Sequence, residues 1–264
     1  MTDQVSSRQQ RLATLLRATS GTIRVSDAAK ALNLDRVHAA KLLAGWHKQG
    51  VIRRISRDLY VPVKPSSLGQ VQVLDDPWTL VPELYSPGYI GGWSALEHWD
   101  FTEQLFRSVC VLTSKRTRKG ERKHQGVSFY VKPISGKRQF GTKTIWRDNV
   151  KLQVSDPSKT MLDIIDDPYI GAGLQHTMDC LREFASTHNT QQDHERLLVY
   201  ADRLRNGALF KKLGFLAEKL EFDKSFIDEC AKRLTTGYAV LDRNAKERKL
   251  VTRWRLWVPK GLEN

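Results

Sequence analysis

Hydrophobic residues near the start of the chain recur at the spacing of an amphipathic helix. Leu12, Leu15 and Leu16 lie within residues 9–19, and Gly21 follows as a stop signal. We therefore predict a first helix over this stretch.

Two more helices and a hairpin are predicted after it. Ser26 is expected to cap a short helix over 27–32, and Asp35 a longer helix that ends near Gln49. Residues 51–63 are β-branched with basic residues inserted, and Arg57-Asp58 is expected to form their turn. Three helices followed by a hairpin are typical of a winged helix-turn-helix, which we predict over residues 1–64. The stretch 62–69 is rich in Pro, Ser and Gly and predicts a short linker, so we place the domain boundary near Pro65.

Residues 65–264 predict a second domain of mixed strands and helices. Strand-like runs occur at 108–113, 127–132 and 150–154, within a basic sheet region of about 107–154, and long basic loops at 115–124 and 135–139 separate them. Asp156, with Pro157 in the first turn, is expected to cap the first helix of a helical region over about 156–234. The alternating run 249–258 predicts a terminal strand that would complete the sheet. The fold class is therefore α+β.

The helix over 36–49 is the predicted recognition helix. Its spacing places Val37, Ala40, Ala44 and His47 on one face, which we expect to pack inward. In helix-turn-helix domains the start of this helix reaches base edges in the major groove. We predict base contacts for Arg36, His38 and Lys41, with Lys48 on the same outward side, and phosphate contacts for Ser26, Arg53, Arg54 and Arg57.

The distribution of charge supports a polyanionic partner. The 264 residues carry a net charge of +14. Residues 1–64 hold 12 Lys and Arg against 4 Asp and Glu, residues 65–106 hold six acids and no base, and residues 107–154 hold 13 bases against 2 acids. Two separate basic blocks result, and fields of this kind attract phosphate backbones.

The second basic block suggests a further contact. We predict that a flexible loop touches nucleic acid or a partner through Lys115, Arg116, Arg118, Lys119, Arg122 and Lys123. Glu121-x-Lys123 matches half of a metal-dependent nuclease signature, so a nucleic-acid-processing enzyme is one alternative function. A non-catalytic basic adaptor that binds only proteins is another.

Other chemistry has weaker support in the sequence. Ser94 lacks the second glycine of a nucleophile elbow, and we interpret it as a structural helix cap. The residues His176, Cys180, His188 and His194 fit no zinc pattern, and we expect no metal, no cofactor and no catalysis. The widely spaced Cys110, Cys180 and Cys230 predict no disulfide framework. Without a long apolar run or a signal-peptide pattern, we expect a cytoplasmic protein that does not engage a membrane.

Three segments together resemble the AbiEi-type antitoxins of abortive-infection (type IV toxin-antitoxin) systems. They are residues 50–61 (GVIRRISRDLYV), 89–99 (YIGGWSALEHW) and 156–173 (DPSKTMLDIIDDPYIGAG). Asp58 stands where the family's wing has glycine, a position that Asp tolerates because it enters the left-handed region more readily than most residues.

The resemblance implies an antitoxin that also represses its own operon. The first domain would bind inverted repeats in its promoter, either as two subunits or as one molecule that bends the site. The second domain would counteract an AbiEii-type nucleotidyltransferase toxin, and in this family neutralisation is thought to need no stable protein complex.

Overall fold

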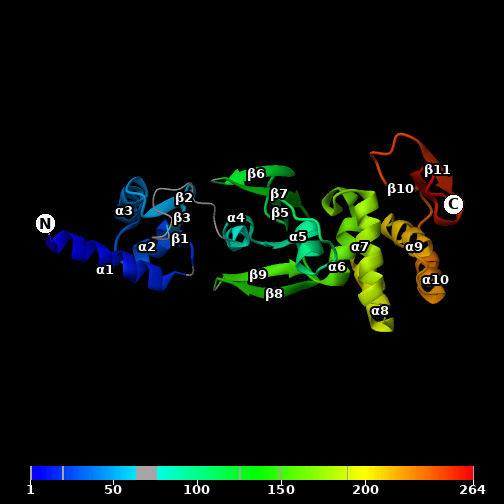
Figure 1. Ribbon diagram of the computed structural model, residues 1–264, viewed down its shortest axis with the longest axis horizontal. Coiled ribbons are helices and arrows are strands. Elements are labelled where there is room, and N and C mark those ends of the chain that lie inside the picture. Colours follow the sequence, from blue (N-terminus) through cyan, green and yellow to red (C-terminus); the bar gives the residue numbers. More distant parts are fainter. Residues whose placement is uncertain are drawn as a thin grey trace.

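The protein is an elongated α+β chain whose parts follow one another along its longest axis (Figure 1). The structure is a computed structural model that describes residues 2–19, 21–63, 76–124, 126–148, 150–188 and 190–263, with side chains from residue 9 onward. The linker and boundary predicted near Pro65 lie outside the described residues. No helix in the described ranges is long and apolar enough to cross a membrane.

The first 63 residues form three helices and a small sheet around a core of their own. The elements are α1 (Thr2–Ala18), β1 (Ile23–Arg24), α2 (Val25–Ala31), α3 (Arg36–Lys48), β2 (Ile52–Ser56) and β3 (Leu59–Pro62). The three strands are antiparallel in the order β1-β3-β2. Leu15, Ile23, Leu43, Trp46 and Ile52 are among the buried residues that hold these elements together.

Helix starts in this part agree only partly with the sequence. The Asp35 carboxylate accepts hydrogen bonds from the backbone of Val37 and His38, so its predicted role as the cap of α3 is confirmed. The predicted cap at Ser26 is wrong, because α2 already begins at Val25. The Asp27 carboxylate accepts the backbone N–H of Arg24 instead, at 3.2 Å.

A six-stranded mixed sheet forms the centre of the molecule. Its order is β6-β7-β5-β4-β9-β8, in which β5 pairs with β7 and β4 with β9 in parallel, and the other pairs are antiparallel. The strands are β4 (Gly88–Ile90), β5 (Ser108–Thr113), β6 (Gly120–His124), β7 (Val127–Pro133), β8 (Thr142–Arg147) and β9 (Val150–Ser155). The three strands predicted from sequence are confirmed as β5, β7 and β9.

The prediction of one long basic loop over 115–124 is wrong in its second half. Residues 120–124 form the edge strand β6, paired with β7 on one side. An edge strand has one ladder open to water, where charged side chains are tolerated and discourage pairing with other chains. The strand therefore lacks the hydrophobic alternation that marks buried strands.

The inner strands of the central sheet are buried on both faces. In β5, Cys110 and Leu112 join the larger core with the helices, whereas Val109 and Val111 join a second core with Trp78. The shorter helical elements around the sheet are η2 (Pro77–Leu80), α4 (Val81–Tyr85), α5 (Gly92–His98) and η3 (Gly136–Arg138).

A helical layer and a second small sheet complete the chain. The helices are α6 (Pro157–Asp166), η4 (Pro168–Gly171), α7 (Leu174–Thr187), α8 (Gln191–Leu204), α9 (Leu209–Lys219) and α10 (Lys224–Lys232). The predicted cap of α6 is confirmed, since the Asp156 carboxylate accepts the backbone N–H of Lys159 at 2.8 Å and Pro157 opens the helix.

The terminal strand expected over 249–258 is corrected by the structure. The chain forms β11 (Arg248–Val251), a short helix η5 (Thr252–Trp254) and β12 (Leu256–Pro259), and these two strands pair with β10 (Ala239–Val240). They make a separate three-stranded sheet and do not extend the central one. Trp254 belongs to η5, between β11 and β12 in the sequence, and its side chain is fully buried, so it interrupts the expected strand.

The β2–β3 hairpin packs on the central part of the molecule. Ile55, Leu59 and Val61 share the second core with Trp78 and other residues around the sheet. Arg24 adds a polar contact, because its guanidinium donates to the Glu83 carboxylate at 2.5 Å and to the Glu83 carbonyl at 2.8 Å. The first 63 residues therefore share packing and polar contacts with the central part of the molecule.

Candidate nucleic-acid interface

Helix α3 presents a different face to the core from the one predicted. The buried residues are Ala39, Leu43 and Trp46, whereas Val37 is 62% exposed and Ala44 and His47 also face outward. The predicted inward face is therefore wrong for Val37, Ala44 and His47, whereas Ala40 is half-buried against the core. Leu43 and Trp46 are larger than Val37 and Ala44 and bury more apolar surface, so they decide which face of the helix points inward.

The basic residues of α3 nevertheless lie on its exposed side. Arg36, His38, Lys41 and Lys48 are all exposed. Arg36 contacts the Asp58 carboxylate at 3.3 Å across a surface pair, and the His38 ring contacts the Asp35 carboxylate. Exposed pairs of this kind contribute little to stability, so these side chains can exchange their partners for a ligand at low cost.

The β2–β3 hairpin brings its arginines beside α3. The turn at Arg57-Asp58 is confirmed, and Asp58 is not among the described residues with positive φ. Arg57 is exposed in the turn. Arg54, by contrast, donates to the carbonyls of Ser56 and Arg57 at 3.2 and 3.0 Å, so it stabilises the hairpin at its irregular register.

The remaining predicted contacts in this part lie at its edge. Arg53 is half-buried on β2 opposite Val61. Ser26 is exposed in the first turn of α2, with its hydroxyl 3.3 Å from an oxygen of the Asp27 carboxylate. That carboxylate sits where a phosphate would have to approach, which weakens the expectation of a phosphate contact at Ser26.

The basic residues of 115–123 fall into two groups. Lys115 donates to the Leu84 carbonyl at 2.7 Å, Lys119 contacts the Asp167 carboxylate at 3.3 Å, and Arg122 donates to the carbonyls of Glu121 and Arg118. Arg116, Arg118 and Lys123 are exposed, and no ion pair joins them to a described residue. Of these six residues, only Arg116, Arg118 and Lys123 have charged groups that make no described contact and can bind a partner directly.

Strand β6 also links this block to the hairpin. His124, the last residue of β6, contacts the Tyr85 hydroxyl at 3.1 Å, and burial lowers its pKa while a hydrogen bond with the Ile55 carbonyl of β2 opposes that change. The end of β6 therefore lies beside β2 of the hairpin that carries Arg54 and Arg57.

No metal centre is assembled from the residues considered in the sequence. Glu121 and Lys123 lie exposed on β6, and the described ranges contain no group of three or more His, Cys, Asp or Glu side chains placed to hold a metal ion. His176 contacts the Gly171 carbonyl at 2.7 Å and the Thr102 hydroxyl at 2.8 Å. His194 lies against Phe222 and Phe226.

Ser94 has a structural contact, as predicted, but not the predicted one. It lies inside α5, which Gly91 caps, and its hydroxyl accepts the Cys110 backbone N–H at 2.9 Å. The three cysteines are free and buried, and burial raises the pKa of Cys180 to about 12 and that of Cys230 to about 12, so both stay protonated thiols.

Lys159, Asp163 and Tyr89 form a buried polar cluster that the sequence did not predict. The Lys159 ammonium donates to the Asp163 carboxylate at 2.5 Å and to the Tyr89 hydroxyl at 2.8 Å, and that hydroxyl donates to Asp163 at 2.7 Å. Burial lowers the pKa of Lys159 and raises that of Tyr89 well above its usual range. The i, i+4 spacing of Lys159 and Asp163 was the available signal in the sequence.

Comparisons with known proteins support the fold. No protein-family model and no curated protein matches the chain. The crystal structure of the Rv2827c protein from Mycobacterium tuberculosis is similar to this chain with a TM-score of 0.66 at 12% sequence identity, over 96% of this chain and 91% of that one. A similarity at this identity is evidence of a shared mixed α+β fold over nearly the whole length of both chains.

Proposed function

We propose that residues 1–63 are a winged helix-turn-helix that binds double-stranded DNA, and that the chain is a sequence-specific repressor of its own operon. The order α1-β1-α2-α3-β2-β3, with a three-stranded antiparallel sheet, supports this assignment. In the proposal α3 is the recognition helix and the β2–β3 hairpin is the wing.

The observation that carries the proposal is the exposed basic side of α3 beside the arginine hairpin. Arg36, His38 and Lys41 lie in the first half of α3, the part of a recognition helix that reaches base edges, and are proposed to read them. Arg57 and Lys48 are proposed to contact phosphates, which position the protein without reading sequence. Helix α3 lies toward the N-terminal end of the molecule (Figure 1).

A second DNA contact is proposed along β6 and the residues before it. Arg116, Arg118 and Lys123 are its members, since their charges are not committed to described acidic partners. Contacts on both sides of the wing would favour a bent site or a long one, as expected for inverted repeats.

The resemblance to AbiEi-type antitoxins extends the proposal to toxin neutralisation. In this extension the chain acts in the cytoplasm, and residues beyond the linker counteract an AbiEii-type nucleotidyltransferase toxin, with or without a stable complex. Co-expression with the adjacent gene tests it. Rescue of growth by the intact chain is expected, and a failure of the chain to restore growth against a toxic neighbour would contradict it.

The DNA-binding proposal is tested by fluorescence anisotropy on the intact chain. DNA from immediately upstream of its gene is compared with scrambled DNA of the same length across a salt series. We expect tighter binding to the native sequence that persists as salt rises, because base contacts survive where phosphate contacts are screened. Equal and steeply salt-sensitive binding to both DNAs would overturn sequence-specific repression.

Matched variants locate the interface. Lys41→Ala is expected to lower the discrimination between native and scrambled DNA, since a good base contact is worth about 1–3 kcal/mol. Lys224→Ala removes the same charge from the exposed start of α10, in the helical layer beyond the sheet, and is expected to leave that discrimination unchanged. Equal effects of the two variants would show that only net charge matters.

A further inference from the structure

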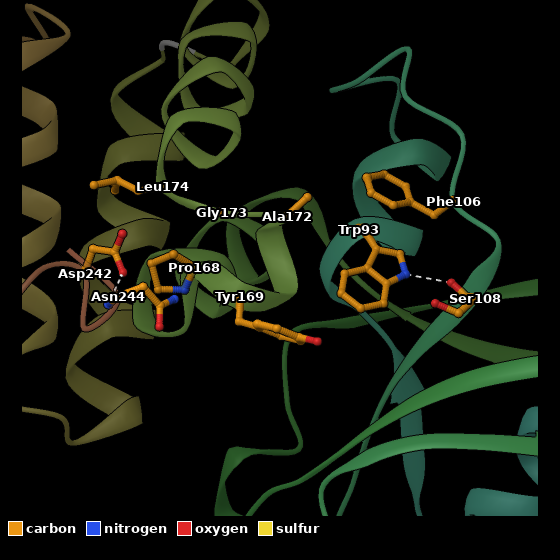
Figure 2. A pocket seen from close by; sticks show the side chains of 10 residues that line it. All are labelled: Trp93, Phe106, Ser108, Pro168, Tyr169, Ala172, Gly173, Leu174, Asp242 and Asn244. Carbon is orange, nitrogen blue, oxygen red and sulfur yellow. Dashed lines mark hydrogen bonds between the residues drawn. The ribbon is translucent and has the colours of Figure 1, made fainter. Parts of the chain in front are cut away.

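A cavity of about 400 Å³ lies between the central part of the molecule and the C-terminal residues (Figure 2). Helix α5 and the start of β5 contribute one wall, the turn from η4 to α7 the floor, and the loop between β10 and β11 the opposite wall. Its lining residues are Trp93, Phe106, Ser108, Pro168, Tyr169, Ala172, Gly173, Leu174, Asp242 and Asn244. This volume lies in the range of small-ligand sites in proteins.

The aromatic wall is held in place before any ligand arrives. The Trp93 indole N–H donates to the Ser108 carbonyl at 2.6 Å, and its ring stacks on Phe106 with centroids 5.7 Å apart. Trp93 is only 8% exposed, whereas Tyr169 is 53% exposed and lies against Tyr130. The Trp93 and Tyr169 rings are tilted by 59° with centroids 6.5 Å apart, and Trp93 already packs against Phe106 and Tyr130. The exposed phenol ring of Tyr169 is therefore the flat surface open to a planar group.

The opposite wall is polar and carries the only formal charge in the lining. One carboxylate oxygen of Asp242 accepts the backbone N–H of Asn244 at 2.8 Å, which orders the loop. The other oxygen has no hydrogen-bond partner among the described residues, and neither has the side-chain amide of Asn244. A carboxylate only accepts, so the matching ligand edge must carry N–H donors.

Basic residues lie on the loop that carries Asp242 and beside the Tyr169 ring, and none of them belongs to the lining. Arg248 donates to the carbonyls of Asp242 and Arg243, so its charge lies against the polar wall. Arg243 and Lys246 are exposed on the same loop. Lys119 lies over the Tyr169 ring at 5.7 Å on the other side. A cationic ligand would meet this rim unfavourably, whereas a ligand with phosphate outside the cavity and a planar donor group inside would match it.

We propose that this cavity binds a nucleotide, with the base stacked on Tyr169 beside the edge of Trp93, its N–H edge on Asp242, and its phosphate toward Arg243, Lys246 and Arg248. Guanine fits the edge best, because its ring N–H and its amino group present two donors side by side to one carboxylate. The site is separate from the α3 surface and goes beyond the proposed repressor function. The nucleotide can be free or part of a single strand, since the chemistry is the same.

Isothermal titration of the intact chain with GMP, AMP, CMP and UMP tests the site. We expect saturable one-to-one binding with GMP tightest. Tyr169→Ala is expected to weaken GMP binding by roughly tenfold, the usual loss when a base-stacking ring is removed. Asp242→Asn is expected to abolish the preference for GMP over AMP.

Matched controls separate the cavity from the rest of the surface. Tyr238→Ala removes a ring that is 64% exposed outside the cavity and should leave GMP binding unchanged. Lys41→Ala, on α3, should also leave it unchanged, so failure of the DNA-binding proposal would not imitate failure here.

Competition by short single-stranded RNA identifies the source of the nucleotide. If guanine-containing oligomers bind much more tightly than GMP and displace it, the natural ligand is a single strand. If oligomers and GMP bind with equal affinity, the natural ligand is the free nucleotide. Absence of saturable binding by mononucleotides and oligomers at millimolar concentration would overturn the proposal. So would GMP binding that Tyr169→Ala and Asp242→Asn leave unaltered in variants with native circular dichroism.

Discussion

Lys159 shows how one buried charge depends on its neighbours. Its side chain is 0% exposed, and Asp163 and Tyr89 are its hydrogen-bond partners. Burial of an ammonium group is unfavourable, and the paired carboxylate, with the Tyr89 hydroxyl as a second partner, compensates for it. The cluster joins α6 to β4, so it positions the helical layer on the sheet.

We therefore expect Asp163→Leu to lower the free energy of unfolding by about 3–5 kcal/mol, because it leaves the Lys159 ammonium unpaired. The double variant Lys159→Met, Asp163→Leu should recover much of that loss, because it buries no charge. Urea denaturation of the two single variants and the double variant measures the coupling. Losses that simply add would show that the two side chains do not depend on each other.

Two helical glycines show how packing decides the effect of the same substitution. A Cβ on Gly214 in α9 would lie 2.0 Å from the buried Trp254 ring, whereas a Cβ on Gly45 in α3 would meet nothing within 4 Å. Alanine raises helix propensity at both positions by up to about 1 kcal/mol.

At Gly214 the collision dominates, and we expect Gly214→Ala to destabilise the protein by roughly 1–3 kcal/mol, as overpacked cores do. Gly45→Ala should instead raise the melting temperature slightly. Thermal unfolding followed by circular dichroism checks both variants, and an increase in melting temperature for Gly214→Ala would mean that Trp254 can move aside.

At the scale of the whole molecule, the shared core couples the first 63 residues to the sheet. Removal of residues 1–64 would take Ile55, Leu59 and Val61 out of the core that they share with Trp78, Leu80 and other residues around the sheet. We expect the remaining fragment to bind a hydrophobic dye and to melt below the intact chain. A fragment that melts like the intact chain would contradict the coupling. For this reason point variants on α3 test the proposed division between DNA binding and toxin neutralisation more cleanly than a truncation.

Acid sensitivity is also a property of the assembled chain. Burial lowers the pKa of His98, His124 and His194 below the ordinary value of 6.5. The unfolded chain then binds more protons just below pH 6.5, so stability is complete above that pH and falls as the pH decreases through the lowered values.

We expect the free energy of unfolding to decrease between about pH 7 and pH 5.5, before the carboxylates titrate. His194→Phe should reduce this slope, because the new ring retains the packing against Phe226 and cannot take up a proton. Urea titrations at several pH values measure it. A wild-type slope that is flat in this window would contradict the expectation.

Short-range signals predicted the local elements well. The caps at Asp35 and Asp156 and the turn at Arg57-Asp58 depend on side chains and backbone within a few residues, and the structure confirms them. The sequence did not predict the edge strand β6, because an edge strand needs no hydrophobic alternation. It predicted one strand in place of β11 and β12, because the run looks continuous although the short helix η5 with Trp254 interrupts it. Propensity is a weak guide wherever tertiary packing overrides it.

By itself, the sequence determined the α+β composition, the separation of charge into two basic blocks, and the position of the basic residues along α3. Only the tertiary structure decided which face of α3 is buried, which of the residues at 115–123 keep an uncommitted charge, and that the hairpin shares a core with the sheet. It also decided that Trp93, Tyr169 and Asp242, far apart in sequence, line one cavity. The reason is physical: charge and capping are properties of a residue and its neighbours, whereas burial and cavities arise from contacts between distant segments.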